Sequence, residues 1–583
     1  MNESLEHKRH TLAHLLAAAV LEKYPHAKLT LGPAIDTGFY YDIDFSGGDT
    51  PGDTDLKELQ RSMKKLLNKW TTFTHEEVSA KKARGIFAGN QFKLELIDEI
   101  EKKGETITLY SCGGFTDLCR GGHTEHPNNE LDTDAFKLEK IAGAYWRGDE
   151  KNPMLTRIYG LAFETKEELE AYEKQQAEAK ARDHRKLGKE LDLFTFSELV
   201  GAGLPLFTPN GTLMRDLIVE KISQIQAKYG YVKVTIPHIT KSDLYKTSGH
   251  WEKFKDELFH VKGQSDTEFV MKPMNCPHHT QIYDARPRSY KELPLRFAET
   301  TMVYRDEQAG ELIGLGRVRS ITQDDGHVFC TVDQIDQEVE NIVNVIKQFY
   351  TSLGMFEEGK FWVSLSVSDP AKPDEYIGER GNWEKAEQML EAVAKRLNLP
   401  YKRVEGEAAF YGPKLDFMFK DAIGRERQLA TAQLDFNMPA RFNLEYTDNA
   451  GKKQTPVMIH RAIAGSLERF MAIMIEHFAG NFPLWLCPTQ LAVIPVADTH
   501  VTYATEVAET LRATGFRVTL DTSNESMGKK IRSAKQMRLP YFIVIGDKEV
   551  ESKTITLESR DTGESELLTI EALSMKLIAE VNV

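Results

Sequence analysis

A charged run divides the chain and limits how it can fold. Between about residues 164 and 190, Glu, Lys, Gln and Ala dominate, and no strong apolar stripe is present. A helix of this composition has little surface to bury and usually lies exposed between folded parts. The run therefore predicts a connecting helix over 164–190. The length of 583 residues fits several domains at roughly 150 residues each.

The segments around this helix differ in their patterns. Residues 1–163 begin with a helical pattern and continue as a mixed segment, and residues 191–485 interleave helices with β-rich runs such as YVKVTIP and FWVSLSV. From residue 486 to 583, strand-like runs (QLAVIPV, FRVTLDT, YFIVIG) alternate with helices. That alternation is typical of a small α/β domain with parallel strands. We therefore predict an α+β multidomain protein.

Composition excludes some classes of protein. No run of about 18 apolar residues could span a bilayer, and the amino terminus lacks the basic start of a signal peptide. Five scattered cysteines indicate a reducing compartment, so we expect a cytoplasmic protein without membrane contact. A net charge of −14 argues against nucleic-acid binding. A local basic cluster could still contact phosphate, or it could be a solvated helix face; its members are Lys529, Lys530, Arg532, Lys535 and Arg538.

A second group of basic side chains lies in the middle segment. Arg305 and Glu307 precede the loop EQAGELIGLG, and Arg317 and Arg319 follow it. Two apposed strands joined by this loop would aim these arginines into one cleft, where guanidinium groups suit phosphate recognition. Surface salt bridges are the alternative. Arg469, in GSLERF, follows two small residues, and neither segment resembles a glycine-rich phosphate loop.

These runs, together with YVKVTIP ending at Pro237, resemble motifs 2, 3 and 1 of class II aminoacyl-tRNA synthetases. The runs KPMNCPHH, TQDDGHVF and VMIHRAI are similar to those of threonyl-tRNA synthetases, in which one Cys and two His bind zinc. The resemblance implies a Zn²⁺ site at Cys276, His327 and His460, whose sequence spacing alone would not join them. Three protein ligands leave one position open for a substrate. It also implies an antiparallel-sheet catalytic core over 191–485.

The resemblance implies further roles in the core. Zinc coordination of the threonine amine and hydroxyl would reject valine, which an apolar pocket excludes by only about 10². The residues expected in catalysis are Arg305, Arg469 and Gln323. Those expected to bind ATP with Mg²⁺ are Arg305, Glu307, Arg317, Ile321, Gln428 and Arg469. Those expected to contact threonine are Asp325, Tyr411, Lys414 and Gln433, with Asp325 accepting from the threonine hydroxyl.

A separate set of His and Cys residues lies near the amino terminus. His10 and His14 are spaced i, i+4 and share one helix face, and Cys119 and His123 repeat that gap in LCRGGH. Taken alone, these pairs suggest a zinc site or a helix surface. With GPAIDTGFYYD and KIAGAYWRGD they resemble the editing domain of threonyl-tRNA synthetases, expected over 1–163. The resemblance implies hydrolysis of seryl-tRNA without a catalytic metal, by His10, His14, Tyr41, Lys93, Asp117, Cys119 and His123.

The segment 486–583 resembles an anticodon-binding domain. Asn524, Arg532 and Glu549 are expected to read anticodon bases, and the basic cluster would then meet phosphate. The chain departs from the family pattern at His278, Ile321, Ala430 and Glu558, and at Gly122, where CRGGH replaces the usual CRGPH. Bacterial relatives usually carry a small ubiquitin-like domain before the editing domain, whereas here the resemblance begins at the editing helix.

The resemblance predicts a homodimer, formed through the catalytic domain, that ligates L-threonine to tRNA(Thr) in two ATP-dependent steps. It also predicts clearance of mischarged seryl-tRNA(Thr). Two alternatives are a class II enzyme for another amino acid and a non-catalytic RNA-binding regulator. The Cys and His set argues against the first, and the presence of Arg305 and Arg469 argues against the second.

Overall fold

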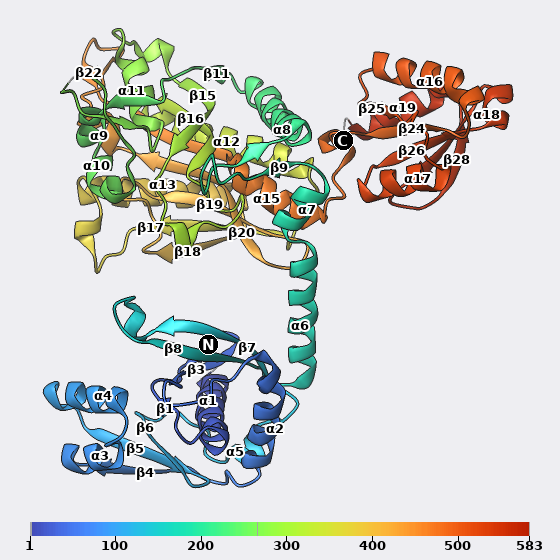
Figure 1. The fold of residues 1–583 in the computed structure, drawn as a ribbon. Helices are drawn as coiled ribbons and strands as arrows, with labels where there is room; N and C mark the ends of the chain where they lie inside the picture. Colours follow the sequence, from blue (N-terminus) through green and yellow to red (C-terminus); the bar gives the residue numbers. More distant parts are fainter. Residues whose placement is uncertain (1–2, 265, 582–583) are drawn as a thin grey trace. The chain divides into compact units, whose positions relative to one another are not determined.

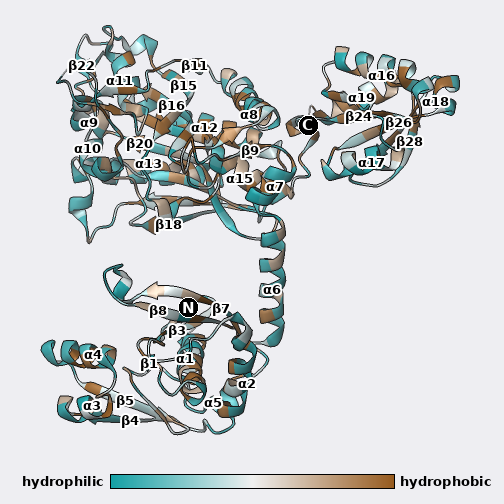
Figure 2. Ribbon diagram, viewed as in Figure 1, coloured by the Kyte–Doolittle hydropathy of each residue, from teal (hydrophilic) through white to brown (hydrophobic). Residues whose placement is uncertain are grey.

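The computed structural model describes residues 3–264 and 266–581 and divides into two units, Met1–Ala177 and Glu178–Val583. The boundary falls within α6 (Lys166–Ala181), which is followed by α7 (His184–Glu190). Leu169 is the one buried residue of α6, and Figure 2 shows this helix as largely hydrophilic. The first helix ends at Ala181, and Asp183 caps the second by accepting from the Arg185 backbone N–H. The predicted connecting helix is therefore two helices.

The amino-terminal unit is built around α1 (Glu3–Lys23). Glu3 and Glu6 lie in its first turn and Lys23 in its last, an arrangement that the helix dipole favours. Its Ala- and Leu-rich middle is buried against β3 and α2, as Figure 1 shows. The surrounding elements are β3 (Gly38–Asp44), α2 (Leu56–Leu67), α4 (Gln91–Lys102), β5 (Ile107–Cys112), β6 (Phe115–Leu118), β7 (Phe136–Tyr145) and β8 (Met154–Ala162).

Two sheets complete this unit. One has the strand order β1-β3-β8-β7, with β2 paired to β3, and the other has the order β4-β5-β6. All of their pairs are antiparallel. The further bounds are β1 (Lys28–Leu29), β2 (Ala34–Ile35), β4 (Thr74–Val78), α3 (Ala80–Ile86) and α5 (Pro127–Glu130). The expected α+β character of this segment is confirmed.

The second unit contains an eight-stranded sheet with the order β11-β15-β16-β23-β20-β19-β17-β18. Its inner pairs from β15 to β17 are antiparallel, and the two edge pairs are parallel. The strands are β11 (Val232–Lys233), β15 (Leu295–Tyr304), β16 (Ser320–Cys330), β17 (Phe361–Val367), β18 (Tyr401–Glu405), β19 (Lys414–Lys420), β20 (Glu426–Asp435) and β23 (Val457–Ser466). The expected antiparallel core is confirmed.

Helices pack on this sheet through apolar faces. In α12, buried Ile335, Val339, Ile342 and Ile346 recur every three or four residues, which places them on one face. The helices of this segment are α8 (Pro209–Ala227), α9 (Ser242–Ser248), α10 (His250–Phe254), α11 (Cys276–Asp284), α12 (Ile335–Thr351), α13 (Arg380–Arg396), α14 (Asn437–Arg441) and α15 (Leu467–Phe478). A small sheet has the strand order β12 (Ile239–Lys241), β14 (Phe269–Met271) and β13 (His260–Val261); β12 precedes α9 in the chain, and the other two strands lie between α10 and α11.

The run YVKVTIP forms less strand than its composition suggests. Only Val232 and Lys233 pair, as β11 beside β15. Pro237 has no N–H to donate, and the Ile236 N–H donates to the Glu299 side chain instead of to a neighbouring strand. The run therefore leaves the edge of the sheet after Val234, whose N–H donates to the Ala298 carbonyl of β15 at 3.1 Å.

The carboxyl-terminal segment forms a five-stranded sheet with the order β25-β24-β26-β27-β28. β24 is parallel to β25 and β26, which confirms the predicted α/β domain with a parallel component. Its elements are β24 (Leu491–Pro495), α16 (Val501–Ala513), β25 (Val518–Leu520), α17 (Met527–Gln536), β26 (Tyr541–Ile545), α18 (Asp547–Ser552), β27 (Ile555–Ser559), β28 (Ser565–Leu568) and α19 (Ile570–Val581).

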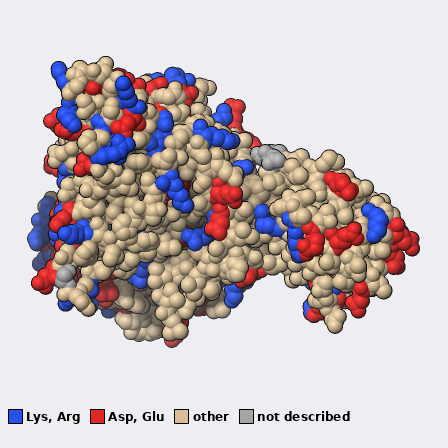
Figure 3. All heavy atoms as spheres, turned by 90° about the horizontal axis from the view of Figure 1, so that it is seen from above, with Lys and Arg blue, Asp and Glu red and all other residues tan. Residues whose placement is uncertain are grey.

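The surface carries charges of both signs. On the face in Figure 3, basic and acidic side chains are interspersed, with uncharged areas between them. No helix within the described residues is long and apolar enough to cross a membrane.

Candidate functional sites

A buried cluster of one thiol and two imidazoles lies on the large sheet. Cys276 is the first residue of α11, His327 lies on β16 and His460 on β23. The antiparallel register places His327 directly opposite His460, with ring centroids 4.8 Å apart. One donor atom from each of the three residues lies within 4.8 Å of the others. The sheet and α11 therefore bring together residues that are far apart in the sequence.

The surroundings of this cluster fit a bound metal ion. His460 Nε2 lies 3.0 Å from Asp435 Oδ2, which leaves Nδ1 as its metal-binding atom. Burial raises the pKa of the Cys276 thiol well above its ordinary value. A metal ion would counter this effect, because it binds the thiolate. One sulfur and two nitrogen donors suit a borderline-soft divalent ion such as Zn²⁺.

The side chains expected to contact threonine surround this cluster. The Tyr411 ring centroid lies 4.9 Å from that of His460, and Gln433 is the cross-strand partner of His460 on β20. Asp325 lies two residues before His327 on the same strand, and its Oδ1 lies 3.6 Å from His327 Nε2. Burial raises the pKa of the Asp325 carboxyl. Three of the four expected residues thus adjoin the histidines.

The fourth, Lys414, and the expected ATP-binding residue Gln428 both contact Asp416, which the sequence patterns did not identify. Asp416 on β19 pairs with Lys414 at 2.7 Å, and its Oδ1 accepts from Gln428 Nε2 at 2.7 Å. Thr431 donates to the same oxygen and Ser366 to the other. Asp416 is buried, and it therefore orients both expected ligand-binding side chains at once.

The arginines around the loop 305–319 lie at the end of a strand pair, and two of them bond to residues of the loop itself. β15 and β16 are antiparallel, and Tyr304 pairs with Ser320 at the start of the loop. The Glu307 carboxylate is buried and pairs with Arg317 at 2.6 Å. Arg319 donates to the backbone carbonyl of Glu307. The loop is therefore held by its own charged side chains.

Arg305 differs from its neighbours because its charge is not neutralised locally. It has no ion pair within the described part of the chain, its Nη2 lies 3.2 Å from Met274 Sδ, and its Nε has no hydrogen-bond partner. Burial lowers the pKa of the guanidinium from its ordinary value. A partly buried, unpaired guanidinium is suited to bind an anion such as a phosphate.

The segment GSLERF places a second arginine at the start of α15. Ser466 caps this helix by accepting from the Arg469 backbone N–H, and the Arg469 side chain is exposed. The buried Glu468 accepts from both the backbone N–H and the hydroxyl of Thr322. Because Thr322 precedes Gln323 on β16, Glu468 ties the helix start to the strand that carries Gln323 and Asp325.

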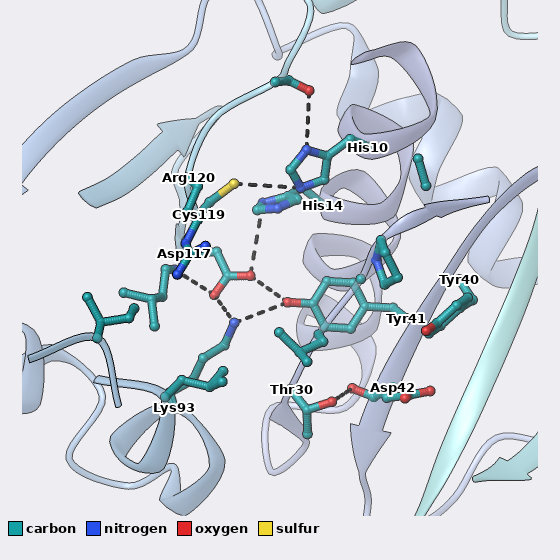
Figure 4. Close-up of a pocket in the computed structure, with 18 of the residues that line it drawn as sticks. His10, His14, Thr30, Tyr40, Tyr41, Asp42, Lys93, Asp117, Cys119 and Arg120 are labelled. Carbon is teal, nitrogen blue, oxygen red and sulfur yellow. Dashed lines mark hydrogen bonds and ion pairs between the residues drawn. The ribbon is translucent and has the colours of Figure 1, made fainter. Parts of the chain in front are cut away.

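A cavity of about 810 Å³ lies in the amino-terminal unit, lined by all the expected editing residues except His123. His10 and His14 project from one face of α1, and Cys119 follows β6 (Figure 4). Cys119 Sγ lies 3.6 Å from His10 Nε2 and 3.3 Å from His123 Nε2. The His10 and His123 rings are stacked at 4.3 Å. One donor atom from each of these four residues lies within 4.8 Å of the others.

A buried charged group adjoins this cluster. Asp117 pairs with Lys93 and accepts from the Tyr41 hydroxyl, both at 2.5 Å, as the dashed lines in Figure 4 show. Burial lowers the pKa of His123 to about 2 and raises that of Cys119 to about 11. At neutral pH the imidazole is therefore uncharged and the thiol protonated. Such a site offers uncharged ring nitrogens as hydrogen-bond acceptors for water and does not present a thiolate, and the low pKa makes His123 a weak base.

Comparison with known proteins agrees with this arrangement. Residues 259–478 match the tRNA synthetase class II core domain (G, H, P, S and T), residues 490–580 an anticodon binding domain, and residues 107–159 the threonyl and alanyl tRNA synthetase second additional domain. The threonine–tRNA ligase of Gloeobacter violaceus is 48% identical over 575 residues, which cover 97% of this chain and 91% of that protein. The threonine–tRNA ligase of Synechococcus elongatus is 46% identical and covers 99% of this chain and 95% of that protein.

The chain belongs to the threonine–tRNA ligase family. Solved structures agree with this membership. The RNA binding domain of threonyl-tRNA synthetase from Cryptosporidium parvum Iowa II is 37% identical with a TM-score of 0.65, and covers 68% of this chain and 98% of that chain. The putative threonyl-tRNA synthetase ThrRS-1 from Aeropyrum pernix is 30% identical with a TM-score of 0.62, and covers 69% and 96%. The predicted three-part fold is confirmed.

Within the ligase fold, the expected anticodon residues have different environments. Asn524 and Arg532 are exposed. Glu549 is partly buried and is engaged within α18, because its carboxylate accepts from the Gly546 N–H at 2.9 Å and from the Thr556 hydroxyl at 2.7 Å. A role in reading a base would therefore require Glu549 to share or exchange these bonds.

Most members of the basic cluster of the ligase's α17 make contacts within the chain. Lys535 pairs with Glu558, Lys529 pairs with Glu525, and Lys530 is buried and donates to the Asp521 carbonyl. Arg538 lies beyond the helix and donates to the carbonyl of Ala479. Of the five residues, Arg532 alone has no such contact in the described chain. The phosphate-binding stripe stays a prediction: the ion pairs of Lys529 and Lys535 are exposed and weak, so phosphate could replace their carboxylates.

The remaining departures from the family pattern are accommodated in different ways. His278 is buried beside Tyr245, and its ring contacts none of the three candidate metal ligands. Ala430 is buried in the sheet opposite Phe417. Ile321 is half-buried at the start of β16. The sequence patterns missed two functional carboxylates, Asp416 and Asp435. Asp435 contacts His460, which is distant in sequence, and no local motif marks such a contact.

Proposed function

We propose that this protein ligates L-threonine to tRNA(Thr) and hydrolyses mischarged seryl-tRNA(Thr) at a separate site. The observation that carries this proposal is the buried cluster of Cys276, His327 and His460 beside Asp325, in a chain of the threonine–tRNA ligase family. Cys276, His327 and His460 would hold one Zn²⁺ per subunit. When bound, this ion supplies coordination positions for the amine and the hydroxyl of threonine.

Threonine discrimination would then come from the chain's own residues around that position. Asp325 would accept a hydrogen bond from the threonine hydroxyl, and Tyr411 and Gln433 would enclose the amino acid. Valine has no hydroxyl and would leave the Asp325 carboxylate without its partner. A site built to bond a hydroxyl rejects an analogue without one far better than an apolar pocket does.

Activation requires attack of the threonine carboxylate on the α-phosphorus of ATP, with pyrophosphate as the leaving group. Arg305, whose charge is unpaired, would bind the α-phosphate, and the exposed Arg469 would bind the γ-phosphate. Gln323 would orient the carboxylate. Mg²⁺ bound with ATP would share the phosphate charge, and Glu307, Arg317, Ile321 and Gln428 would line the nucleotide site. The contribution of the protein is mainly positioning and charge stabilisation.

In the second step, a terminal ribose hydroxyl of the tRNA attacks the carbonyl carbon of the threonyl adenylate, and AMP leaves. Asn524, Arg532 and Glu549 would recognise the anticodon in the carboxyl-terminal domain. We propose a homodimer through the catalytic domain, because β11 is an edge strand whose Val232 is 53% exposed. All five cysteines are free thiols, which supports a cytoplasmic location.

Editing would occur in the cavity of the amino-terminal unit. Serine also carries a hydroxyl and is smaller than threonine, so a hydroxyl-reading site cannot exclude it. We propose that the uncharged imidazoles of His10, His14 and His123 position a water molecule, and that one of them accepts its proton as the water attacks the seryl carbonyl carbon. The ester C–O bond then breaks, the proton passes to the ribose oxygen of the leaving tRNA, and serine is released. The adjoining wall of the cavity would be formed by the bonded group of Lys93, Asp117 and Tyr41. The protonated thiol of Cys119 would lie beside the imidazoles of His10 and His123. This proposal involves no catalytic metal.

The experiment that tests the proposed function is amino-acid-dependent exchange of pyrophosphate into ATP. Exchange that threonine stimulates, and that valine stimulates far more weakly, supports the proposal. Exchange with another amino acid would indicate a sister class II enzyme. No exchange with any amino acid would favour a regulator that binds RNA without catalysis.

A further inference from the structure

Two neighbouring histidines on α11 are buried near the candidate zinc site but differ in their contacts. His278 is 7% exposed, and neither of its ring nitrogens has a hydrogen-bond partner among the residues described. His279 is fully buried, and its Nδ1 lies 2.7 Å from Nδ1 of His327. Of the two, His279 alone therefore contacts a candidate metal ligand.

The direction of this hydrogen bond follows from the chemistry of a metal ligand. A bond between two ring nitrogens needs one donor and one acceptor. If His327 binds zinc through Nε2, its Nδ1 carries the proton and donates it to Nδ1 of His279. The opposite direction would place the His327 proton on Nε2 and close that nitrogen to the metal.

The acceptor role of His279 determines where its own proton lies. A neutral imidazole that accepts at Nδ1 carries its proton on Nε2. This nitrogen lies 3.6 Å from Oε2 of Glu299. Both atoms are buried, and neither has a hydrogen-bond partner in the described chain. The separation is longer than a hydrogen bond, so the contact between them is electrostatic. The second carboxylate oxygen, Oε1, accepts from the Ile236 backbone N–H at 3.0 Å.

We infer that His279 and Glu299 are positioning residues that fix the tautomer and the ring orientation of His327 for zinc. The inference rests on the proposed zinc site. Oε2 of Glu299, on β15, faces His279 Nε2–H and favours the proton there by its negative charge. His279 accepts from His327 Nδ1–H, so that His327 Nε2 faces the metal. Partners of this kind, behind the ligands themselves, commonly change metal affinity by about 10–100-fold when they are removed. Glu299 also ties the segment before Pro237 to the metal ligand.

The test compares the rate at which the full-length, zinc-loaded protein releases zinc to a chelator. His279→Leu removes the acceptor for His327, and we expect release about 10–100-fold faster than in the unmodified protein. His279→Asn places an amide oxygen near the position of Nδ1 and should restore slow release in large part. A merely space-filling role for His279 would favour Leu over Asn or make no distinction between them.

Glu299→Gln tests the second contact while keeping the shape of the side chain. An amide has no charge and only one oxygen, whereas Glu299 accepts from Ile236 and faces the proton of His279. One donor would then face another donor, and faster zinc release is expected. His278→Ala is the matched control, because it removes the adjacent buried imidazole without touching His327, and its release rate should equal that of the unmodified protein.

The outcomes of these measurements distinguish failure of the zinc site from failure of the positioning role. An unmodified protein that takes up no zinc would overturn the zinc site and, with it, this inference. A protein that binds zinc, but releases it at the same rate after His279→Leu and Glu299→Gln, would overturn the positioning role alone. Equal acceleration by His278→Ala and His279→Leu would show a packing effect and would likewise overturn it.

Discussion

His327 on β16 lies directly opposite His460 on β23, and their ring centroids are 4.8 Å apart. The antiparallel register creates this relationship, because a shift of one residue would turn one imidazole to the other face of the sheet. Cys276 joins the pair from the first turn of α11. The position of the candidate metal site is thus fixed by strand pairing and by one helix start.

Replacing the sulfur ligand should separate threonine recognition from nucleotide binding. We expect Cys276→Ser to lose bound zinc and to lower threonine-dependent pyrophosphate exchange by at least about 100-fold, while ATP still binds. Metal analysis and exchange rates measure the first two effects, and equilibrium ATP binding measures the third. Cys330→Ser is the control, since Cys330 is also buried but lies outside the cluster. A Cys276→Ser protein that binds no metal and is fully active would contradict the zinc proposal.

Removing the hydroxyl acceptor should weaken discrimination against valine. We expect Asp325→Ala to lower kcat/KM for threonine by about 10–100-fold, the effect of one lost charged hydrogen bond, while the weak valine-dependent exchange changes little. The measurement is exchange kinetics with both amino acids. An equal fall for threonine and valine would show that Asp325 does not contact the hydroxyl.

The editing site should be separable from the synthetic site. We expect His10→Ala to leave threonine activation intact and to slow deacylation of seryl-tRNA by about 10²–10⁴-fold, the usual contribution of a general base. His26→Ala serves as a control, because His26 lies outside the cavity lining and contacts the Asp49 carbonyl. If the His10→Ala protein clears seryl-tRNA at the normal rate, the editing assignment is wrong.

The buried histidines should make the stability of the amino-terminal unit depend on pH. Burial lowers the pKa of His123 to about 2 and that of His14 well below its ordinary value of 6.5. Below pH 6.5 the unfolded chain binds protons that the folded chain does not, so stability is full above that pH and falls as the pH drops towards 2. For His123 this loss amounts to about 2 kcal/mol between pH 6.5 and 5.

Thermal unfolding of the full chain at several pH values measures this effect. We expect the transition of the amino-terminal unit to fall on acidification, and His123→Gln to reduce that fall. A pH dependence that is unchanged in the His123→Gln protein would contradict the predicted protonation. Because the His123 imidazole stays uncharged in the folded protein down to about pH 2, deacylation of seryl-tRNA should persist on acidification until the amino-terminal unit unfolds.

Much of the fold could be predicted from sequence because it depends on local patterns. Three sequence features each determine the structure of a short segment, because they depend only on residues a few positions apart. They are the hydrophilic run of α6, the alternation after residue 486, and the i, i+4 spacing of His10 and His14. The arginines beside the loop 305–319 are similarly local, since the strands that carry them are consecutive. These expectations required no knowledge of distant contacts.

Tertiary structure alone determined which basic side chains are free of ion pairs and which residues orient the candidate metal ligands. The basic residues of α17 have the composition of a phosphate-binding face, yet Glu525, Glu558 and backbone carbonyls occupy most of them. Asp435 and His279 are distant in sequence from the candidate ligands that they contact. Sequence set the types of donor and acceptor, and the strand register and burial determined their partners, because a hydrogen bond depends on distance in space and not on separation along the chain.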